Sequence, residues 1–171
     1  TYRVAHHGAD VVNPGGFGGV AETLPSAAVA PVSVVNDGGL AIDIIGVNHS
    51  PVEPALGFRF RYQGRSVVIS GDTIYHPGLV SAAKGADLLV HEALQPTMVS
   101  AIADAADAAG RGNVAAVMRD ILDYHASPED AARAAAEAGV KQLALYHIVP
   151  PLPSLLLEPL FLGDAKSAFP G

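Results

Sequence analysis

The alternation of apolar and polar residues predicts several short strands in this chain. Residues 57–62 alternate Phe and Tyr with Arg, the pattern of a strand with one exposed face. A Gln63-Gly64 turn joins them to the apolar residues 66–70, and the two segments together predict a β-hairpin. Four more apolar runs with turn residues beside them are expected to be strands: 29–35, 40–47, 86–90 and 140–146.

Helical signals lie between the later strands. The sequence Ser127-Pro128-Glu129-Asp130 predicts a helix start with a capping hydroxyl, a proline at the first position and acidic residues in the first turn. That helix is expected to end at Gly139. Further helices are expected at 77–84, 96–109 and 113–122, the last with an apolar stripe facing the core (Val114, Val117, Met118, Ile121). The proline-rich tail from residue 148 is expected to be a loop.

Polar residues with metal-binding or acid–base chemistry follow the predicted strands. They are His49, Asp72, His91 with Glu92, and His147. Residues just beyond the strand ends of an α/β sheet share one rim, so we expect these side chains to meet. A carboxylate such as Asp72 at the end of a buried strand needs a metal ion, a helix N-terminus or a histidine as partner. The alternatives are that Asp72 only caps its turn, or that Gly71-Asp72 marks an ordinary ligand-binding domain, although no Gly-x-Gly-x-x-Gly motif follows a strand.

Composition limits the chemistry further. The chain has 171 residues, half of them hydrophobic, which fits one ordered domain. It has no cysteine, so a metal would be held by His, Asp and Glu. The formal net charge of -7 argues against a broad nucleic-acid surface. No apolar run reaches the length of a membrane span, and the compartment stays open, cytoplasmic or, if an upstream signal was removed, periplasmic.

An ordered set of short motifs resembles a known family. The set runs from Asn48-His49-Ser50-Pro51 through Ser70-Gly71-Asp72-Thr73, His91-Glu92-Ala93, and Tyr124-His125-Ala126-Ser127-Pro128 to Tyr146-His147. It resembles the C-terminal half of a metallo-β-lactamase-fold hydrolase of the ribonuclease Z and arylsulfatase-like branch. The resemblance implies an α/β fold, an αββα sandwich that is incomplete here. Residues 1–171 would then be the C-terminal part of one domain, with an irregular 1–30 segment and a proline-rich 150–171 tail.

The resemblance also implies roles for individual residues. His49 would bind one metal ion, His147 a second, and Asp72 would bridge them. The two divalent ions would be zinc foremost, with manganese or iron as alternatives, and would activate water. His125 would act as general acid alongside the catalytic Asp72, while Thr73, His91 and Glu92 would orient the ligands without binding metal.

Two departures from the family pattern shape the expected function. The His-x-His-x-Asp-His motif that supplies further ligands is absent; His6-His7-Gly8-Ala9-Asp10 has its composition but not its spacing, so we expect an incomplete metal site. Only 22 residues lie between His49 and Asp72, too few for the tRNA-gripping arm of bacterial ribonuclease Z enzymes. With the acidic charge, this predicts a small-molecule substrate, a phosphodiester, sulfate ester or lactone, and no nucleic-acid partner. The alternative is a non-catalytic scaffold or dimerisation module; a homodimer is compatible with either.

Overall fold

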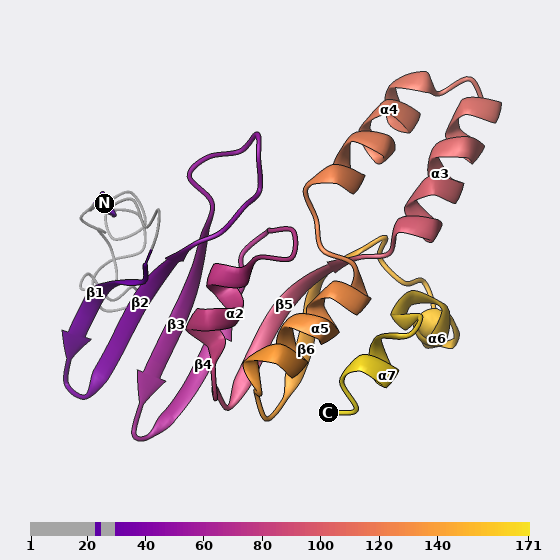
Figure 1. The fold of residues 1–171 in the computed structure, drawn as a ribbon. Coiled ribbons are helices and arrows are strands. Elements are labelled where there is room, and N and C mark those ends of the chain that lie inside the picture. The colour runs from indigo at the N-terminus through magenta and orange to yellow at the C-terminus, as the bar shows by residue number, and fades with distance from the viewer. Residues whose placement is uncertain (1–22, 25–29) are drawn as a thin grey trace, which may run out of the picture.

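A six-stranded mixed sheet forms the centre of the molecule. The computed structural model describes residues 23–24 and 30–171, so the 6–10 motif and nearly all of the 1–30 segment lie outside the described residues. The strands follow one another across the sheet in chain order (Figure 1). They are β1 (Val32–Asp37), β2 (Leu40–Gly46), β3 (Leu56–Tyr62), β4 (Arg65–Ile69), β5 (Leu88–Leu94) and β6 (Leu143–Val149).

The first four strands pair antiparallel and the last three pair parallel. The predicted β3–β4 hairpin is confirmed, with Tyr62 opposite Arg65. Its two turn residues, Gln63 and Gly64, both have positive φ values of 47° and 76°. Such turns match the right-handed twist of the flanking strands, which explains why two residues suffice to reverse the chain.

Two helices cover one face of this sheet and build the core. In Figure 1, α2 (Pro77–Ala83) and α5 (Pro128–Ala138) lie side by side across the strands. They bury an apolar cluster against the sheet that includes Ile45, Val68, Leu79, Leu89 and Ala135. The predicted ends of α5 are confirmed: Ser127 Oγ accepts a hydrogen bond from the Asp130 N–H at 3.0 Å, and Gly139 ends the helix in the left-handed conformation. The α/β class with flanking helices is therefore as predicted.

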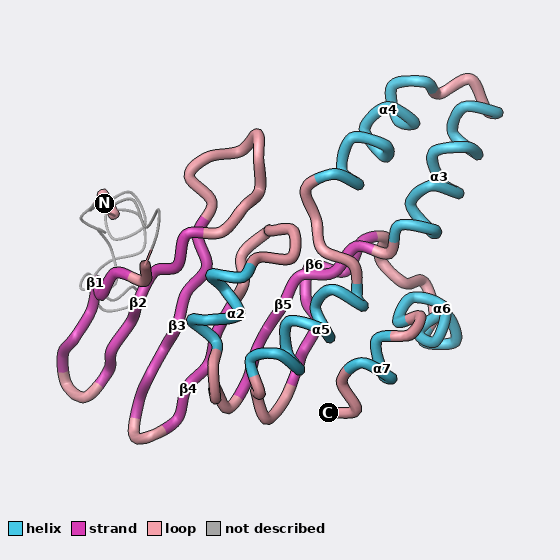
Figure 2. Tube along the Cα trace, viewed as in Figure 1, coloured by secondary structure: helices cyan, strands magenta, loops and turns pink. Residues whose placement is uncertain are grey.

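A helical hairpin projects away from the sheet. Helices α3 (Pro96–Ala108) and α4 (Gly112–Asp120), followed by the short 3₁₀ helix η2 (Ile121–Asp123), extend beyond the carboxyl ends of β5 and β6 (Figures 1 and 2). The prediction that the Val117 stripe faces the core was wrong, because α4 packs mainly on α3 at the periphery. Val117 is 55% exposed, and Ala115 is the buried residue of the helix.

The C-terminal tail also differs from the prediction of a loop. It contains η3 (Leu155–Leu157), α6 (Glu158–Leu162) and α7 (Ala165–Ala168). Proline does not prevent α6, because Pro159 occupies the first turn, where no backbone donor is needed. Phe161 is buried and anchors the tail, while Leu155 and Leu156 are largely exposed. Among the described helices, none combines the length and the apolar character that crossing a membrane requires.

Candidate active site

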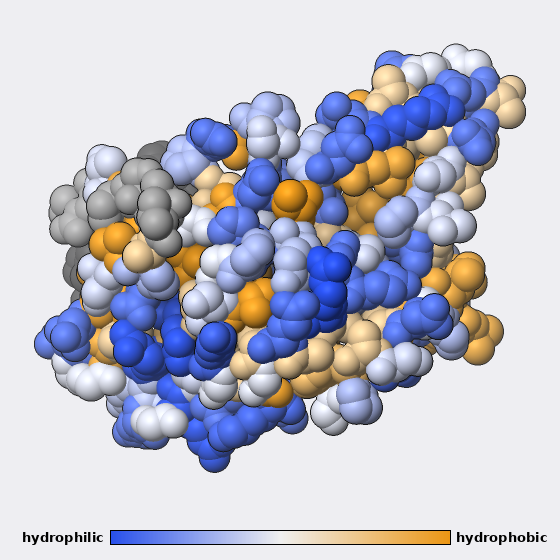
Figure 3. Space-filling model, viewed as in Figure 1, coloured by the Kyte–Doolittle hydropathy of each residue, from blue (hydrophilic) through white to orange (hydrophobic). Residues whose placement is uncertain are grey.

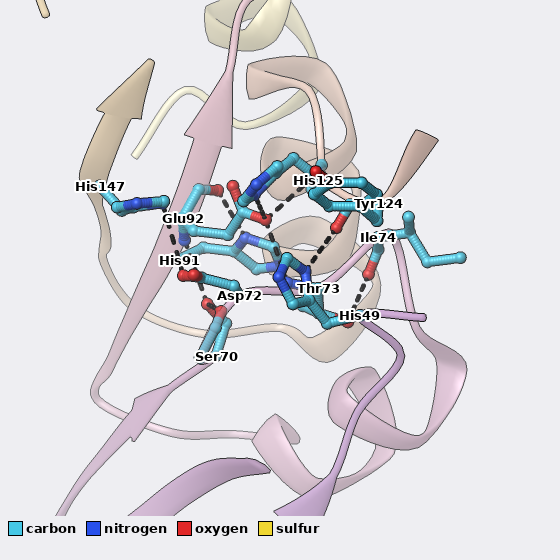
Figure 4. A network of polar contacts seen from close by, with 12 residues as sticks. His49, Ser70, Asp72, Thr73, Ile74, His91, Glu92, Tyr124, His125 and His147 are labelled. Carbon is cyan, nitrogen blue, oxygen red and sulfur yellow. Dashed lines mark hydrogen bonds and ion pairs between the residues drawn. The ribbon is translucent and has the colours of Figure 1, made fainter. Parts of the chain in front are cut away.

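Side chains from five segments meet beyond the helix-covered core, at the rim where β2, β4 and β5 end. His49 follows β2, Asp72 follows β4, Glu92 comes from β5, His125 follows η2 and His147 comes from β6 (Figure 4). The structure thus brings together the predicted site residues, as the strand-end argument expected. Two details of their placement differ from the prediction.

The first difference is that His91 and Glu92 lie inside a strand rather than after it. β5 continues to Leu94 because it keeps pairing with β6. Both His91 and Glu92 are fully buried. Because these two polar residues interrupt an apolar run, the sequence indicated that the strand ends before them. In the structure they are instead buried within the strand, at the centre of the site.

The second difference concerns His147, which lies within β6. Glu92 pairs with Tyr146 and Ala93 with Ile148, so His147 is an extra residue at an irregularity in the ladder. Its φ is 46°, and its side chain is 43% exposed. A bulge of this kind re-aims one side chain, and here it directs the imidazole toward Asp72.

Glu92 is the buried carboxylate around which the site is built. One oxygen, Oε1, accepts hydrogen bonds from His125 Nδ1 at 2.8 Å, from the Thr73 N–H at 3.0 Å and from the Ala126 N–H at 3.3 Å. The other oxygen, Oε2, has no hydrogen-bond partner among the described residues. Because a buried charge is costly without such donors, these bonds hold three chain segments in register.

His125 has its protonation controlled by this carboxylate. Burial acts most strongly and lowers its pKa, but the hydrogen bond to Glu92 and the negative charges of Glu92 and Asp72 together outweigh it, so the pKa of His125 is raised. The His125 ring lies 4.9 Å from the His49 ring and 5.5 Å from the His147 ring, measured between centroids. With Nδ1 bonded to Glu92, Nε2 is the nitrogen available for proton transfer.

Asp72 and His147 form the solvent-accessible part of the site. Asp72 Oδ1 lies 3.4 Å from His147 Nδ1, and the two side chains are 39% and 43% exposed. His49 Nδ1 donates to the Tyr124 carbonyl at 2.9 Å. That bond fixes the imidazole tautomer and leaves Nε2 as its free nitrogen, the arrangement typical of a metal-binding histidine.

Thr73 fastens two strand ends to each other. Its Oγ1 accepts from the Asn48 N–H at 3.1 Å and donates to the Ile74 carbonyl at 2.9 Å. The Ile74 N–H in turn donates to the Asn48 carbonyl at 3.0 Å. These bonds set the position of His49 relative to Asp72.

His91 is buried beneath the site, in surroundings that favour the neutral form of its imidazole. Its Nδ1 donates to the Glu92 carbonyl at 2.8 Å, and burial lowers its pKa. Its Nε2 has no partner among the described residues. His91 therefore supports the strand and does not reach the accessible rim.

Two contributors were not foreseen from the sequence. Ser70 is fully buried; its Oγ donates to the Gly71 carbonyl at 2.6 Å and accepts from the Glu92 N–H at 3.1 Å. Tyr124 contributes its backbone carbonyl to His49. A small hydroxyl residue at the end of a strand is a signal that could have indicated Ser70, but a backbone contact such as that of Tyr124 leaves no trace in the sequence.

The site contains a candidate set of metal ligands. Among the described residues, the ligand atoms of Glu92, His125 and His147 all lie within 4.8 Å of one another. Imidazole nitrogen and carboxylate oxygen are suitable ligands for zinc and similar divalent ions. This set shares only His147 with the set implied by the family resemblance, and Asp72 lies beside it.

Comparison with known proteins identifies the family. Residues 19–148 match the beta-lactamase superfamily domain. The chain belongs to the beta-lactamase superfamily. The predicted resemblance is thereby confirmed. The match includes every predicted site residue and all six strands except Val149, the last residue of β6.

Several similar curated proteins are named ribonuclease Z. The chain is 38% identical over 151 residues to the ribonuclease Z of Mycolicibacterium paratuberculosis, covering 88% of this chain and 47% of the relative. It is 34% identical over 149 residues to the ribonuclease Z of Mycobacterium marinum, covering 87% and 47%. The chain therefore spans about half the length of the curated relatives it matches.

Solved structures confirm the fold. The metallo-beta-lactamase fold protein YhfI from Bacillus subtilis superposes with a TM-score of 0.56 at 22% identity, covering 82% of this chain and 47% of that one. The short form of human tRNase Z superposes with a TM-score of 0.50 at 24% identity, covering 69% and 39%. The six-stranded sheet and its flanking helices thus match the metallo-β-lactamase fold.

The expectation of a small-molecule substrate and no nucleic-acid partner was wrong. It is contradicted by relatives that are ribonucleases. The expectation relied on the net charge of the whole chain, but nucleic acid responds to the local distribution of charge. The short His49–Asp72 connection shows only that no long arm is inserted between these two residues.

Proposed function

We propose that this chain is the C-terminal part of a divalent-metal-dependent hydrolase that cleaves phosphodiester bonds in RNA. The observation that carries the proposal is the meeting of His49, Asp72, His125 and His147 around the buried Glu92. Superfamily membership and the ribonuclease Z relatives support this reaction class.

The residues present fit divalent metal ions. We assign His49, Asp72 and His147 as ligands of two ions, zinc foremost, because Asp72 and His147 are open to solvent. Glu92 is close enough to belong to the ligand set, but Oε1 already accepts three hydrogen bonds and the side chain is fully buried. We therefore assign Glu92 to orienting His125. When bound, such ions supply an activated water and stabilise charge on the phosphate.

His125 would deliver the proton that the leaving group needs. Glu92 holds its Nδ1 and raises its pKa, so the imidazolium form persists closer to neutral pH. The Nε2–H would then face the rim on which His49 and His147 lie. General acid catalysis of this kind contributes about 10²- to 10⁴-fold to a rate.

The test is metal-dependent cleavage of RNA. Labelled tRNA transcripts are incubated with the whole hydrolase of which we propose this chain to be a part, loaded with zinc or manganese, with and without EDTA. We expect cleavage only with metal, a fall of at least about 100-fold for Asp72→Asn, and a loss of bound zinc in the same variant. Asp107→Asn, on the projecting α3, makes the same chemical change outside the site and should leave both quantities unaltered.

The opposite results would refute the proposal. RNA left intact by metal-loaded protein would favour a non-catalytic scaffold. Cleavage that persists in Asp72→Asn would show that the site is elsewhere. Zinc binding that survives in Asp72→Asn but disappears in Glu92→Gln would replace our ligand assignment with the Glu92, His125, His147 set.

A further inference from the structure

A polar pocket lies at the end of the sheet opposite the candidate active site. Its volume is about 460 Å³, and the turns β1–β2 and β3–β4 form its border. Asn36, Ala41, Arg59, Arg61, Arg65 and Ser66 are among the residues that line it. In Figure 3, strongly hydrophilic residues gather over this lower end of β1 to β4.

The strand register explains why the pocket is hollow and basic. Arg59 and Arg61 alternate along β3, so both side chains are on the face that carries α2. Ala41 pairs directly with Arg61. A small residue opposite a long one leaves the space beneath the guanidinium group unfilled.

Positive charge exceeds negative charge here, in a chain whose net charge is -7. Arg61 pairs with Asp43 at 2.7 Å, while Arg65 and Lys141 share Asp87 at 3.4 Å and 2.7 Å. Among the described residues, three arginines line the pocket itself, Arg59, Arg61 and Arg65, and no carboxylate does.

Arg59 has hydrogen-bonding capacity to spare. One terminal nitrogen donates to the Ala82 carbonyl at 2.7 Å. Its Nε is buried and has no partner among the described residues. Buried donors without a partner are uncommon in folded proteins, so this guanidinium is held in place while one of its donors is unsatisfied.

The pocket is separate from the candidate active site. The seven residues of β3 span about 20 Å, and the pocket is at the β3–β4 turn while His49 and Asp72 are at the other end. No residue that lines the pocket is one of those assigned to the metal site.

We propose that this pocket, which we name the arginine pocket, binds a phosphate-bearing ligand. Guanidinium groups bind phosphate oxygens through paired, charge-assisted hydrogen bonds. Arg61 and Arg65 are 50% and 79% exposed in their side chains, so both can reach a ligand while Asp43 and Asp87 hold their positions. Ser66 and Asn36 add polar groups to the wall.

The phosphate has two possible sources, a free phosphorylated compound or the backbone of an RNA that also occupies the active site. The second source rests on the proposed function, and the first does not. Because β3 separates the pocket from the rim by about 20 Å, an RNA that extends from the active site is long enough to reach the pocket.

The experiment measures binding in EDTA, so that it does not depend on metal or cleavage. Pyrophosphate and a short RNA duplex are titrated separately by calorimetry and by backbone amide NMR. We expect shifts at Gln63, Gly64 and Ser66, and a dissociation constant raised at least about tenfold in the double variant Arg61→Gln/Asp43→Asn. The double substitution removes the pair without leaving Asp43 unpaired, and a thermal melt verifies the fold.

The double variant Arg133→Gln/Asp130→Asn is the matched control, because it also removes one exposed arginine–aspartate pair. Arg133 is also 50% exposed and paired with an aspartate, but it lies on α5, and its loss should change binding by less than about twofold. If RNA binds through the pocket, the Arg61 variant should also lower the salt dependence by about one counterion. If pyrophosphate binds tightly and the RNA duplex does not bind, the ligand is a free phosphorylated compound.

Two results would overturn the proposal. One is the absence of amide shifts at the β3–β4 turn with either probe. The other is equal weakening by the Arg61 and Arg133 variants, which would indicate non-specific charge attraction. If the protein binds RNA at the arginine pocket but cleaves no RNA, the proposed function is refuted while the phosphate-binding role of the pocket is supported.

Discussion

Replacing Glu92 with Gln tests whether one buried carboxylate organises the site. The substitution keeps the size and an acceptor oxygen, but it removes the charge that His125 Nδ1, the Thr73 N–H and the Ala126 N–H share. The new amide group would place its N–H donors where Oε2 now has no described partner.

The magnitude follows from these three bonds. A hydrogen bond to a charged group contributes about 1 kcal/mol more than one to a neutral group, so the loss is about 3 kcal/mol. Because the glutamine carries no charge, the folded variant avoids the desolvation cost of burying one, and this offsets part of the lost stability. We expect the free energy of unfolding to fall by about 2 kcal/mol.

The deficit should depend on pH through His125. The pKa of His125 is raised above its ordinary value of 6.5, chiefly by Glu92 acting against the effect of burial. The resulting stability is fully present below pH 6.5 and is lost as the pH rises through the raised pKa. The deficit of Glu92→Gln should therefore be larger at pH 5.5 than at pH 8.5.

Two measurements check this on metal-free protein. Urea unfolding followed by circular dichroism gives the deficit at both pH values, and NMR titration of the imidazole protons gives the pKa of His125 directly. In Glu92→Gln that pKa should fall, because burial remains while the carboxylate is gone. Glu137→Gln, an exposed carboxylate on α5, should change neither quantity appreciably. A pKa of His125 that stays constant in Glu92→Gln would refute the reasoning.

Three further substitutions test other parts of the structure. Gly71→Ala should destabilise by at least about 2 kcal/mol, because φ is +66° and the added Cβ would collide with the Leu56 carbonyl; thermal unfolding measures this. Asp87→Asn should lower stability at pH 7, since hydrogen bonds from the Lys141 ammonium and the Ser66 N–H lower the pKa of Asp87 to about 2. That difference should be complete above pH 3.8 and vanish as the pH falls through about 2, as acid titration of both proteins would show. Phe161→Ala should cost about 3 to 5 kcal/mol in urea unfolding and release the C-terminal helices to proteolysis, because Phe161 is their buried anchor.

Local signals in the sequence were sufficient for much of the fold. The Gln63-Gly64 turn and the ends of α5 are each determined by neighbouring residues, and the structure has them as predicted. The prediction that the apolar stripe of α4 faces the core was wrong for a physical reason. Periodicity indicates which face of a helix is apolar, but not whether that face meets a core or only the adjacent helix.

The sequence predicted that these polar side chains lie close together, but not how they are arranged. His49, Asp72 and His125 were identified by motif order, and the structure brings them to one rim. The burial of Glu92 and the bulge at His147 depend on how β5 pairs with β6 over a long sequence separation. Pairing of that kind is a tertiary property, and no short motif encodes it.

The projecting α3–α4 hairpin has a consequence for how this protein can diverge. Its two ends are joined where the chain leaves and re-enters the sheet: the Leu94 N–H donates to the Ala126 carbonyl at 2.8 Å. The bond between Glu92 and His125 lies next to that junction, because Glu92 is two residues before Leu94 and His125 is one residue before Ala126. Residues 96–123 can therefore lengthen, shorten or be exchanged in evolution, or carry an inserted reporter domain, while the distance between Glu92 and His125 is preserved.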